Sequence, residues 1–347
     1  MIISQIETIN AVGHLLCHDI TKIEKGAFKG ALFKKGHQIR PEDVEILLNI
    51  GKNHIYTLEL EAGELHEETA GERIAAAIAG PGLIIEGPSE GRLNLIAENS
   101  GLLNVDPSRL LQINSVPDVI VATLHNYSPV QAREKVAGAK VIPLVVGEAT
   151  VIKVEDICAS GDSLISVTPY QPFKLGGLIT GREVFEGRIK DGFAPVLAEK
   201  AAGYNLEKPL IRYCPDDADL IAAGIKELVA EGCNLITITG GMSVDPDDVT
   251  PSGIRKTGAE IIKYGAPALP GAMFLLAYLK DIPLVGLPAC AMYFNTTIFD
   301  LILPRLLAGQ QVSAGDIAAL GHGGLCRQCK VCIYPDCSFG KGGAYLR

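Results

Sequence analysis

Between residues 171 and 310 the sequence alternates short apolar stretches with amphipathic ones, and this alternation restricts the chain to few folds. Strands are expected over 176–180, 210–214, 235–239 and 283–287, and helices over 193–203, after Pro215 and over 296–307. Strands separated by helices pair in parallel, because each helix returns the chain to the same end of the sheet. The predicted fold class is α/β, with a mostly parallel three-layer αβα domain over 171–310.

Three further regions are expected outside this domain. Residues 1–80 mix short strands with two helices, one of which begins at Arg40-Pro41 with acidic residues in its first turn. Residues 81–170 contain short apolar runs between turn residues, which predicts a β-rich region with a small barrel or a mixed sheet. Residues 311–347 are expected to form a linker and a cysteine-rich tail.

The composition excludes several classes of partner. The chain has 347 residues, a net charge of -9 and a pI near 5.4. An acidic chain without a basic stretch offers no surface that neutralises nucleic-acid phosphates. There is no run of about eighteen apolar residues to cross a membrane, and the first residues lack the basic segment of a signal peptide. We therefore expect a soluble, cytoplasmic protein that binds neither nucleic acid nor membranes.

A glycine pair marks the most informative loop of the chain. The strand expected over 235–239 runs into Gly240-Gly241, and a helix is expected to begin at Thr250-Pro251. Glycines let the backbone approach a ligand closely, and a helix N-terminus offers free N–H groups to an anion. Three aspartates in the same loop would repel a bare phosphate. The loop therefore predicts a phosphorylated ligand handled with a divalent cation, or a ligand with donor groups.

Two aspartates near this loop are candidates for catalysis. Asp216 follows Pro215 and also fits the N-cap of the next helix, so both roles are open. Thr250 fits an N-cap with Pro251 at the first helical position. If Thr250 is the cap, Asp248 is left to hold a cation such as Mg²⁺, which prefers carboxylates together with substrate phosphates.

The nine cysteines fall into two groups. Five are scattered among apolar neighbours and are expected to be buried free thiols. The other four form a Cys-x2-Cys-x2-Cys-x4-Cys pattern: Cys326, Cys329, Cys332 and Cys337. Thiolates so close together favour a metal site, with zinc and an iron–sulfur cluster both open, and disulfides or unligated thiols are the alternative.

Five motifs follow one another in a fixed order within 172–310. They are Pro215-Asp216-Asp217, Thr239-Gly240-Gly241-Met242-Ser243, Asp248-Val249-Thr250-Pro251, Pro270-Gly271 and Gly286-Leu287-Pro288. Together they resemble the molybdopterin-binding domain of molybdopterin adenylyltransferases and molybdenum insertases. About the first sixty residues are more faintly similar to the insertases. The whole layout, with its cysteine tail, is most similar to bacterial molybdopterin-binding proteins.

The resemblance implies specific roles. In that family the glycine loop holds the terminal phosphate of molybdopterin, and matched aspartates serve adenylyl transfer and metal handling. It thus implies catalytic roles for Asp216 and Asp248, with Mg²⁺ and ATP, and it implies a homo-oligomer. The residues expected to bind the cofactor are Thr239, Gly240, Gly241, Met242, Ser243, Thr250, Asp191 and Pro288.

The sequence also departs from the family. Leu269 and Ala272 stand where two lysines flank the Pro-Gly motif, and Ala289-Cys290 replace the Gly-Asn of a turn. The insertases' aspartate–glycine–tyrosine motif is missing from 21–36. Each lost lysine removes a charge-assisted hydrogen bond of roughly 1.5–3 kcal/mol. These changes count against molybdate insertion, whereas pterin binding is still expected.

Three functions remain open at this point. In the first, the chain binds molybdopterin or the molybdenum cofactor and acts in its biosynthesis, loading or sensing, with a molybdoenzyme as partner. In the second, it is a Mg·ATP-dependent molybdopterin adenylyltransferase in which Asp248 holds Mg²⁺. In the third, the loop takes a pyrophosphate and the chain hydrolyses a nucleotide.

Overall fold

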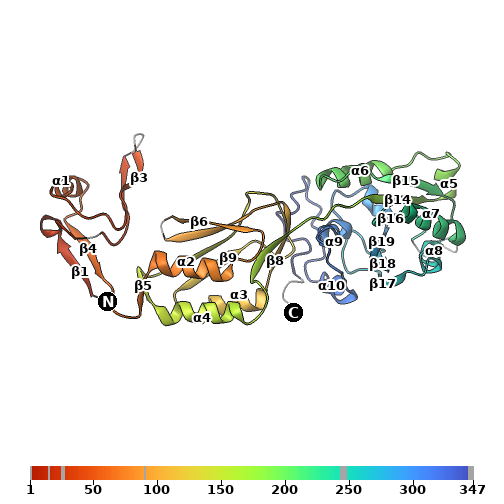
Figure 1. The fold of residues 1–347 in the computed structure, drawn as a ribbon. Helices are drawn as coiled ribbons and strands as arrows, with labels where there is room; N and C mark the ends of the chain where they lie inside the picture. The colour runs from red at the N-terminus through yellow and green to blue at the C-terminus, as the bar shows by residue number, and fades with distance from the viewer. Residues whose placement is uncertain (1, 15, 25–27, 90, 243–247, 343–347) are drawn as a thin grey trace. The chain divides into compact units, whose positions relative to one another are not determined.

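The computed structural model describes residues 2–14, 16–24, 28–89, 91–242 and 248–342. The chain folds into two compact units (Figure 1). The N-terminal unit comprises 1–98, 108–124 and 132–166, and the C-terminal unit comprises 99–107, 125–131 and 167–347. No helix in the described ranges is long and apolar enough to cross a membrane.

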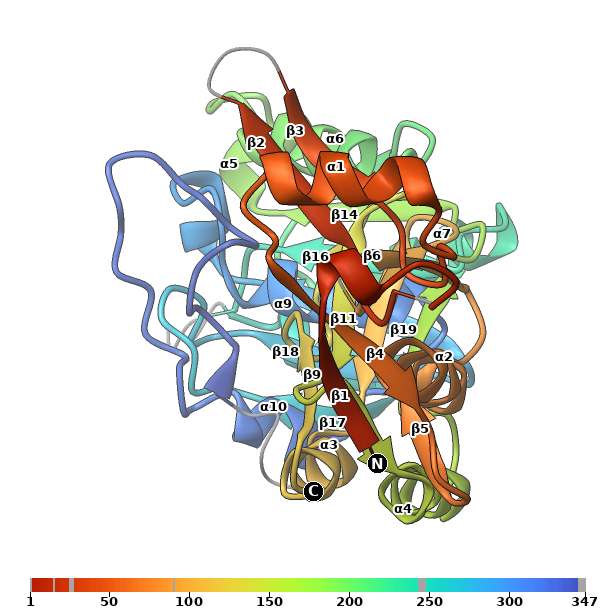
Figure 2. The ribbon, with the colours of Figure 1, turned by 90° about the vertical axis from the view of Figure 1, so that its left-hand side faces the viewer.

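The first part of the N-terminal unit contains two antiparallel strand pairs, a short 3₁₀ turn, η1 (Thr8–Asn10), and one helix. β1 (Ile2–Glu7) pairs with β4 (His54–Glu59), as Figure 2 shows, and β2 (Ile20–Glu24) pairs with β3 (Phe28–Phe33). α1 (Pro41–Asn49) begins where the sequence predicted it, because Asp43 accepts a hydrogen bond from the Arg40 N–H at 2.9 Å. A small apolar core lies here: Ala11, Leu16, Ile20, Phe33, Ile39, Leu47 and Ile55.

The rest of the N-terminal unit contains an antiparallel sheet of order β6-β7-β11-β9. Its strands are β6 (Leu83–Ser89), β7 (Arg92–Ala97), β9 (Val119–Thr123) and β11 (Lys135–Val141). This part also contains a short strand pair, β5 (Glu64–His66) with β12 (Val145–Gly147). Its three helices are α2 (Glu67–Ile78), α3 (Pro107–Asn114) and α4 (Glu148–Ala159). Arg73 of α2 forms ion pairs with Glu148 and Glu155 of α4 at 2.7 and 2.8 Å, which joins these two helices.

The C-terminal unit is built on a six-stranded sheet of order β15-β14-β16-β19-β18-β17. The four parallel strands are β14 (Leu175–Thr180), β15 (Leu210–Cys214), β16 (Leu235–Thr239) and β19 (Ile282–Leu287). β18 (Leu275–Leu279) and β17 (Glu260–Tyr264) continue the sheet antiparallel. A separate three-stranded sheet contains β8 (Gly101–Val105), β10 (Pro129–Val130) and β13 (Ile165–Pro169).

Helices cover both faces of the six-stranded sheet, as the α/β prediction requires. α7 (Ala218–Ala230) and α8 (Thr250–Lys256) pack on the core that contains Ile236 and Ile238 (Figure 1). α6 (Phe193–Gly203), α9 (Ile298–Leu307) and α10 (Ala314–Ala319) pack on a second core that contains Leu235. Successive residues of a strand point to opposite faces, so Leu235 and Ile236 assign the two cores to the two faces. The short elements α5 (Arg182–Phe185) and η2 (Ala289–Met292) follow β14 and β19.

Helix α9 depends on a buried capping box. The Thr297 hydroxyl accepts the Phe299 N–H, and the Asp300 carboxylate accepts the Thr297 N–H at 2.7 Å. We predict that Thr297→Ala lowers the free energy of unfolding by about 0.5–2 kcal/mol, the usual loss for a helix cap. Thr69→Ala, at an exposed position in the first turn of α2, is the control and should not lower it. Urea unfolding of both variants measures the difference, and equal stability would contradict the capping role.

Candidate functional site

The glycine pair after β16 lies directly against neighbouring backbone. Gly240 has a φ of +90° and Gly241 a φ of +54°, in the region that favours glycine. A Cβ atom on Gly240 would lie 2.5 Å from the Thr180 carbonyl oxygen, and one on Gly241 would lie 2.7 Å from Thr250 Oγ1. Both positions therefore require glycine, and the turn draws together the ends of β14 and β16 and the start of α8.

Two buried hydroxyls end the strands at this turn. The Thr180 and Thr239 side chains are 4% and 0% exposed, and neither hydroxyl has a hydrogen-bond partner among the described residues. Thr180 Oγ1 would be 2.6 Å from a Cβ on Gly240, so this hydroxyl faces the turn. A buried polar group without a partner costs roughly 1–3 kcal/mol, and few proteins retain one without a reason.

Asp216 lies at the same turn, and it does not cap the following helix. The cap of α7 is Asp217, whose carboxylate accepts the N–H groups of Asp219 and Leu220 at 2.8 and 3.0 Å. The capping interpretation of Asp216 is therefore wrong. Its Oδ2 instead accepts the Arg182 N–H at 3.0 Å, and its Oδ1 would be 3.6 Å from a Cβ on Gly241.

Thr250 also has a different role from the predicted cap. The N-cap of α8 is Val249, and Thr250 is the first helical residue. The Thr250 hydroxyl donates to the Gly240 carbonyl oxygen at 2.9 Å, and its N–H donates to the Gly241 carbonyl oxygen at 3.3 Å. Thr250 thus fastens the glycine turn to α8. Because α8 has only seven residues, its dipole adds little to anion binding.

Asp248 is half-buried just before α8. Burial, and to a smaller extent the nearby Asp248 charge, raises the pKa of the Tyr264 hydroxyl. That hydroxyl donates to the Met242 carbonyl oxygen at 2.9 Å. Asp248 therefore lies near Tyr264, whose hydroxyl contacts the Met242 backbone. Ser243, another expected ligand contact, falls outside the described residues, and the catalytic role of Asp248 remains a prediction.

Two residues that were expected to bind the cofactor, Pro288 and Met242, lie next to β19. Thr239 of β16 is paired in parallel with Leu287, so Pro288 follows the strand next to the glycine turn. Met242 is 5% exposed, and its Cε would be 2.5 Å from a Cβ on Gly286. The Met242 side chain therefore fills the core above Gly286, which leaves its backbone as the part that can face a ligand.

Asp191 has its carboxylate engaged at the start of α6. It accepts the Phe193 N–H at 2.7 Å and the Ala194 N–H at 3.2 Å, and the Tyr213 hydroxyl donates to it at 3.0 Å. These bonds explain an aspartate at this position by local structure alone. Its predicted contact with a cofactor remains untested.

Thr180 and Arg182 belong to this site, and the sequence analysis did not identify them. Thr180 ends β14, and β14 is paired in parallel with β16, with Ile179 opposite Thr239. Ligands in open parallel sheets bind beyond the carboxyl ends of the strands. That rule, applied to the strand expected over 176–180, was the signal that could have found Thr180.

The four tail cysteines lie elsewhere in the C-terminal unit. Cys326, Cys329, Cys332 and Cys337 all line one cavity, together with residues that precede α9. Within the described ranges, no group of three or more His, Cys, Asp and Glu side chains is arranged to hold a single metal ion. The metal prediction for these cysteines therefore stays a prediction.

The close approach at Gly240 has a measurable consequence. Gly240 and Gly258 both have a φ of +90°, but a Cβ on Gly258 would meet nothing within 4 Å. Alanine at either position loses about 1–2 kcal/mol in the left-handed conformation. We predict that Gly240→Ala loses about 1–3 kcal/mol more than Gly258→Ala, because it also forces Thr180 away. Denaturant unfolding of the two variants measures this difference. Equal losses of unfolding free energy would mean that Thr180 does not pack closely against Gly240.

Two segments of the chain match known protein families. Residues 176–308 match the family described as probable molybdopterin binding domain, and residues 5–59 match a domain of unknown function, DUF8806. CinA-like proteins from Mycobacterium sp. (strain JLS) and Mycobacterium tuberculosis (strain ATCC 25177 / H37Ra) are 34% and 31% identical over 90 residues. Those residues are 26% of this chain and 21% of each relative, so the chain matches about a fifth of these curated proteins.

Solved structures give weaker likenesses. The molybdopterin biosynthesis enzyme MoaB from Thermus thermophilus is 20% identical, with a TM-score of 0.33, over 40% of this chain and 98% of that one. The molybdopterin biosynthesis moea protein from Pyrococcus horikosii is 14% identical, with a TM-score of 0.32, over 88% of this chain and 74% of that one. The family match, set on the six-stranded sheet and its glycine turn, identifies residues 176–308 as a probable molybdopterin binding domain.

Proposed function

We propose that the C-terminal unit binds molybdopterin or the molybdenum cofactor, with the terminal phosphate of the pterin at the Gly240-Gly241 turn. The observation that carries this proposal is the buried Thr180 hydroxyl, which faces the turn and lacks a partner among the described residues. A phosphate oxygen accepts hydrogen bonds from hydroxyls and from backbone N–H groups. The match of 176–308 to a probable molybdopterin binding domain supports this ligand over other phosphates.

Different residues of the turn contribute in different ways to ligand binding. Gly240 and Gly241 bring the backbone close to the ligand because neither carries a side chain. Thr180 supplies a buried hydroxyl that faces the turn, and Thr250 holds the turn in place. A site that is ordered before the ligand arrives loses little entropy on binding, so its hydrogen bonds contribute almost fully to affinity.

Leu269 stands where the family has one of its two lysines, and its surroundings support binding without catalysis. The Leu269 N–H donates to the Gly324 carbonyl oxygen at 2.7 Å, and the Leu269 carbonyl oxygen accepts the Cys326 N–H at 2.8 Å. The tail therefore pairs with the segment where the family has a cation for the phosphate. Without that charge, stabilisation of a transferring phosphoryl group is weakened. The chain therefore carries, loads or senses the cofactor for a molybdoenzyme in this proposal.

The competing function is adenylyl transfer. In this reaction the molybdopterin phosphate attacks the α-phosphorus of ATP, pyrophosphate leaves, and an adenylylated pterin forms. Asp216 and Asp248 would be the carboxylates that hold Mg²⁺, which neutralises charge on the ATP phosphates. Asp216 already accepts the Arg182 N–H with one oxygen, so its other oxygen is the one left for a cation.

The threonine hydroxyls allow a direct test of the binding site. We predict that Thr180→Val weakens molybdopterin binding roughly ten- to a hundredfold, because a hydrogen bond to a charged group contributes about 1.5–3 kcal/mol. The stability of the ligand-free protein should not fall, since the lost hydroxyl has no described partner. Isothermal titration of anaerobically purified protein gives the affinity, and denaturant unfolding gives the stability.

The control for this experiment is Thr237→Val on the same strand as Thr239. The buried Thr237 hydroxyl donates to the Gly176 carbonyl oxygen at 3.1 Å. This variant should lose about 0.5–1.5 kcal/mol of stability and keep its affinity, which is the reverse of the Thr180 result. If Thr180→Val left the affinity unchanged, the phosphate would have to bind elsewhere.

A second experiment separates binding from catalysis. With molybdopterin and Mg·ATP, we predict tight binding, no ATP consumption and no adenylylated pterin. Asp248→Ala should then change the pterin affinity by no more than a few-fold. Adenylylated pterin in multiple turnovers, lost in Asp248→Ala, would establish the transferase instead. ATP or dinucleotide hydrolysis without pterin would favour the nucleotide-hydrolase function.

A further inference from the structure

The cysteine tail surrounds a cavity that the binding function does not use. The cavity has a volume of about 190 Å³, and all four tail cysteines lie on its wall. Tyr293, Phe294 and Ile333 contribute apolar or aromatic surface to the same wall, and Arg327 contributes a cationic side chain. Four thiols around one space, next to a positive charge, make a site for a group that binds sulfur and carries negative charge once it is bound.

Two kinds of metal group are held by four cysteines in proteins, a single zinc ion and an iron–sulfur cluster. Zinc holds four sulfurs at about 2.3 Å from one ion, so a closed zinc site brings them into a single tight tetrahedron. The described side chains form no such single-ion group, and the cysteines instead stand around an open volume. In a [4Fe–4S] cluster each cysteine binds its own iron atom, so the thiolates lie farther apart around a larger body.

The local backbone already supports one of the thiols as a ligand. The Gln328 N–H donates to Cys326 Sγ at 3.4 Å, within the Cys326-x2-Cys329 turn. Gln328 has a φ of +51°, a left-handed conformation that is uncommon for a residue with a side chain. Hydrogen bonds from backbone N–H groups to cysteine sulfur stabilise thiolates and tune the potential of iron–sulfur clusters.

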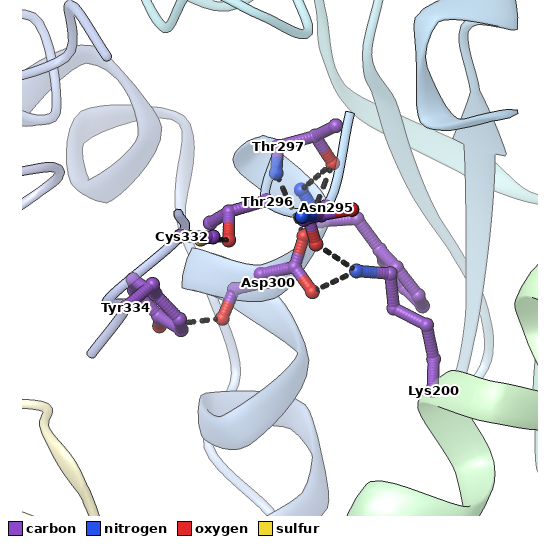
Figure 3. Close-up of polar contacts among 8 residues, drawn as sticks. Lys200, Asn295, Thr296, Thr297, Asp300, Cys332 and Tyr334 are labelled. Atoms are coloured by element: carbon purple, nitrogen blue, oxygen red, sulfur yellow. Dashed lines mark hydrogen bonds and ion pairs between the residues drawn. The ribbon is translucent and has the colours of Figure 1, made fainter. Parts of the chain in front are cut away.

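The loop is also anchored to the core of the unit at several points. Cys332 Sγ lies 3.1 Å from the Thr296 hydroxyl, and the Tyr334 hydroxyl donates to the Asp300 carbonyl oxygen at 2.9 Å (Figure 3). Asp300 in turn forms an ion pair with Lys200 of α6. The cysteines are therefore carried by a loop that is fixed against the first turn of α9.

We infer that Cys326, Cys329, Cys332 and Cys337 bind one [4Fe–4S] cluster in this cavity. The Cys-x2-Cys-x2-Cys run is the spacing used for such clusters in bacterial ferredoxins, where the fourth ligand comes from a second run. This chain has one such run, and Cys337 on the same cavity wall supplies the fourth thiolate. Each thiol releases its proton as its sulfur binds iron, and the adjacent Arg327 offsets part of the resulting negative charge.

The experiment uses the full chain, purified without oxygen and incubated with ferrous iron, ferric iron and sulfide, because a resting [4Fe–4S] cluster contains iron in both oxidation states. We expect about four iron atoms and about four acid-labile sulfides per chain, with the absorption and reduced-state electron paramagnetic resonance signal of a [4Fe–4S] cluster. Cys329→Ser and Cys332→Ser should each lose most of the bound iron and sulfide. Cys158→Ala, which removes a buried thiol in the N-terminal unit, should bind as much as the unchanged chain.

Folding is checked separately, because a serine variant that unfolds would lose iron for a trivial reason. Circular dichroism and molybdopterin titration of each variant report on the C-terminal unit without the cluster. A protein that binds one zinc ion per chain and retains no sulfide would overturn the inference in favour of a single-ion site. Iron without sulfide, two irons per chain, no bound metal, or equal binding by the serine variants would overturn it too.

Discussion

The parallel pairing of β14 with β16 is the constraint on which the candidate site depends. It places Thr180 and Thr239 at the same edge of the sheet, and it forces the next residue, Gly240, to cross the end of β14. A side chain on Gly240 would clash with the Thr180 carbonyl oxygen, so the turn exists only because glycine stands there. The same crossing leaves the Thr180 hydroxyl buried and facing the turn. Strand order therefore creates the site, and the loop residues complete it.

The tail affects this domain through the segment before Pro270-Gly271. Its backbone pairs with Leu269, and Leu269 stands at a position where related domains have lysine. A lysine there would project a charge beside backbone that the tail now covers. The domain keeps the Gly240-Gly241 turn and has an uncharged side chain at residue 269.

The sequence predicted the sheet well because its signals are local. The strands β15 and β16 and the helix α6 have the bounds that apolar runs and turn residues indicated. The edge strand β17 was missed, since an exposed strand with a bulge between Ile261 and Lys263 lacks both periodicity and a buried run. The starts of α7 and α8 were each displaced by one residue. Adjacent aspartates cannot be told apart as caps without the geometry of the turn.

The one-residue displacements of the α7 and α8 starts affect the candidate site more than the missed strand β17 does. With Asp217 as the cap of α7, Asp216 is available to the glycine turn, and with Thr250 inside α8 its hydroxyl fastens that turn. The tail contacts could not be predicted either, because Leu325 and Leu269 meet through backbone groups that every residue possesses.

The buried threonines link ligand binding to stability. Without a ligand, the Thr180 and Thr239 hydroxyls have no described partner, which destabilises the folded unit by roughly 1–3 kcal/mol for each such group. A ligand that satisfies them recovers this energy only in the folded state, so its binding raises the free energy of unfolding.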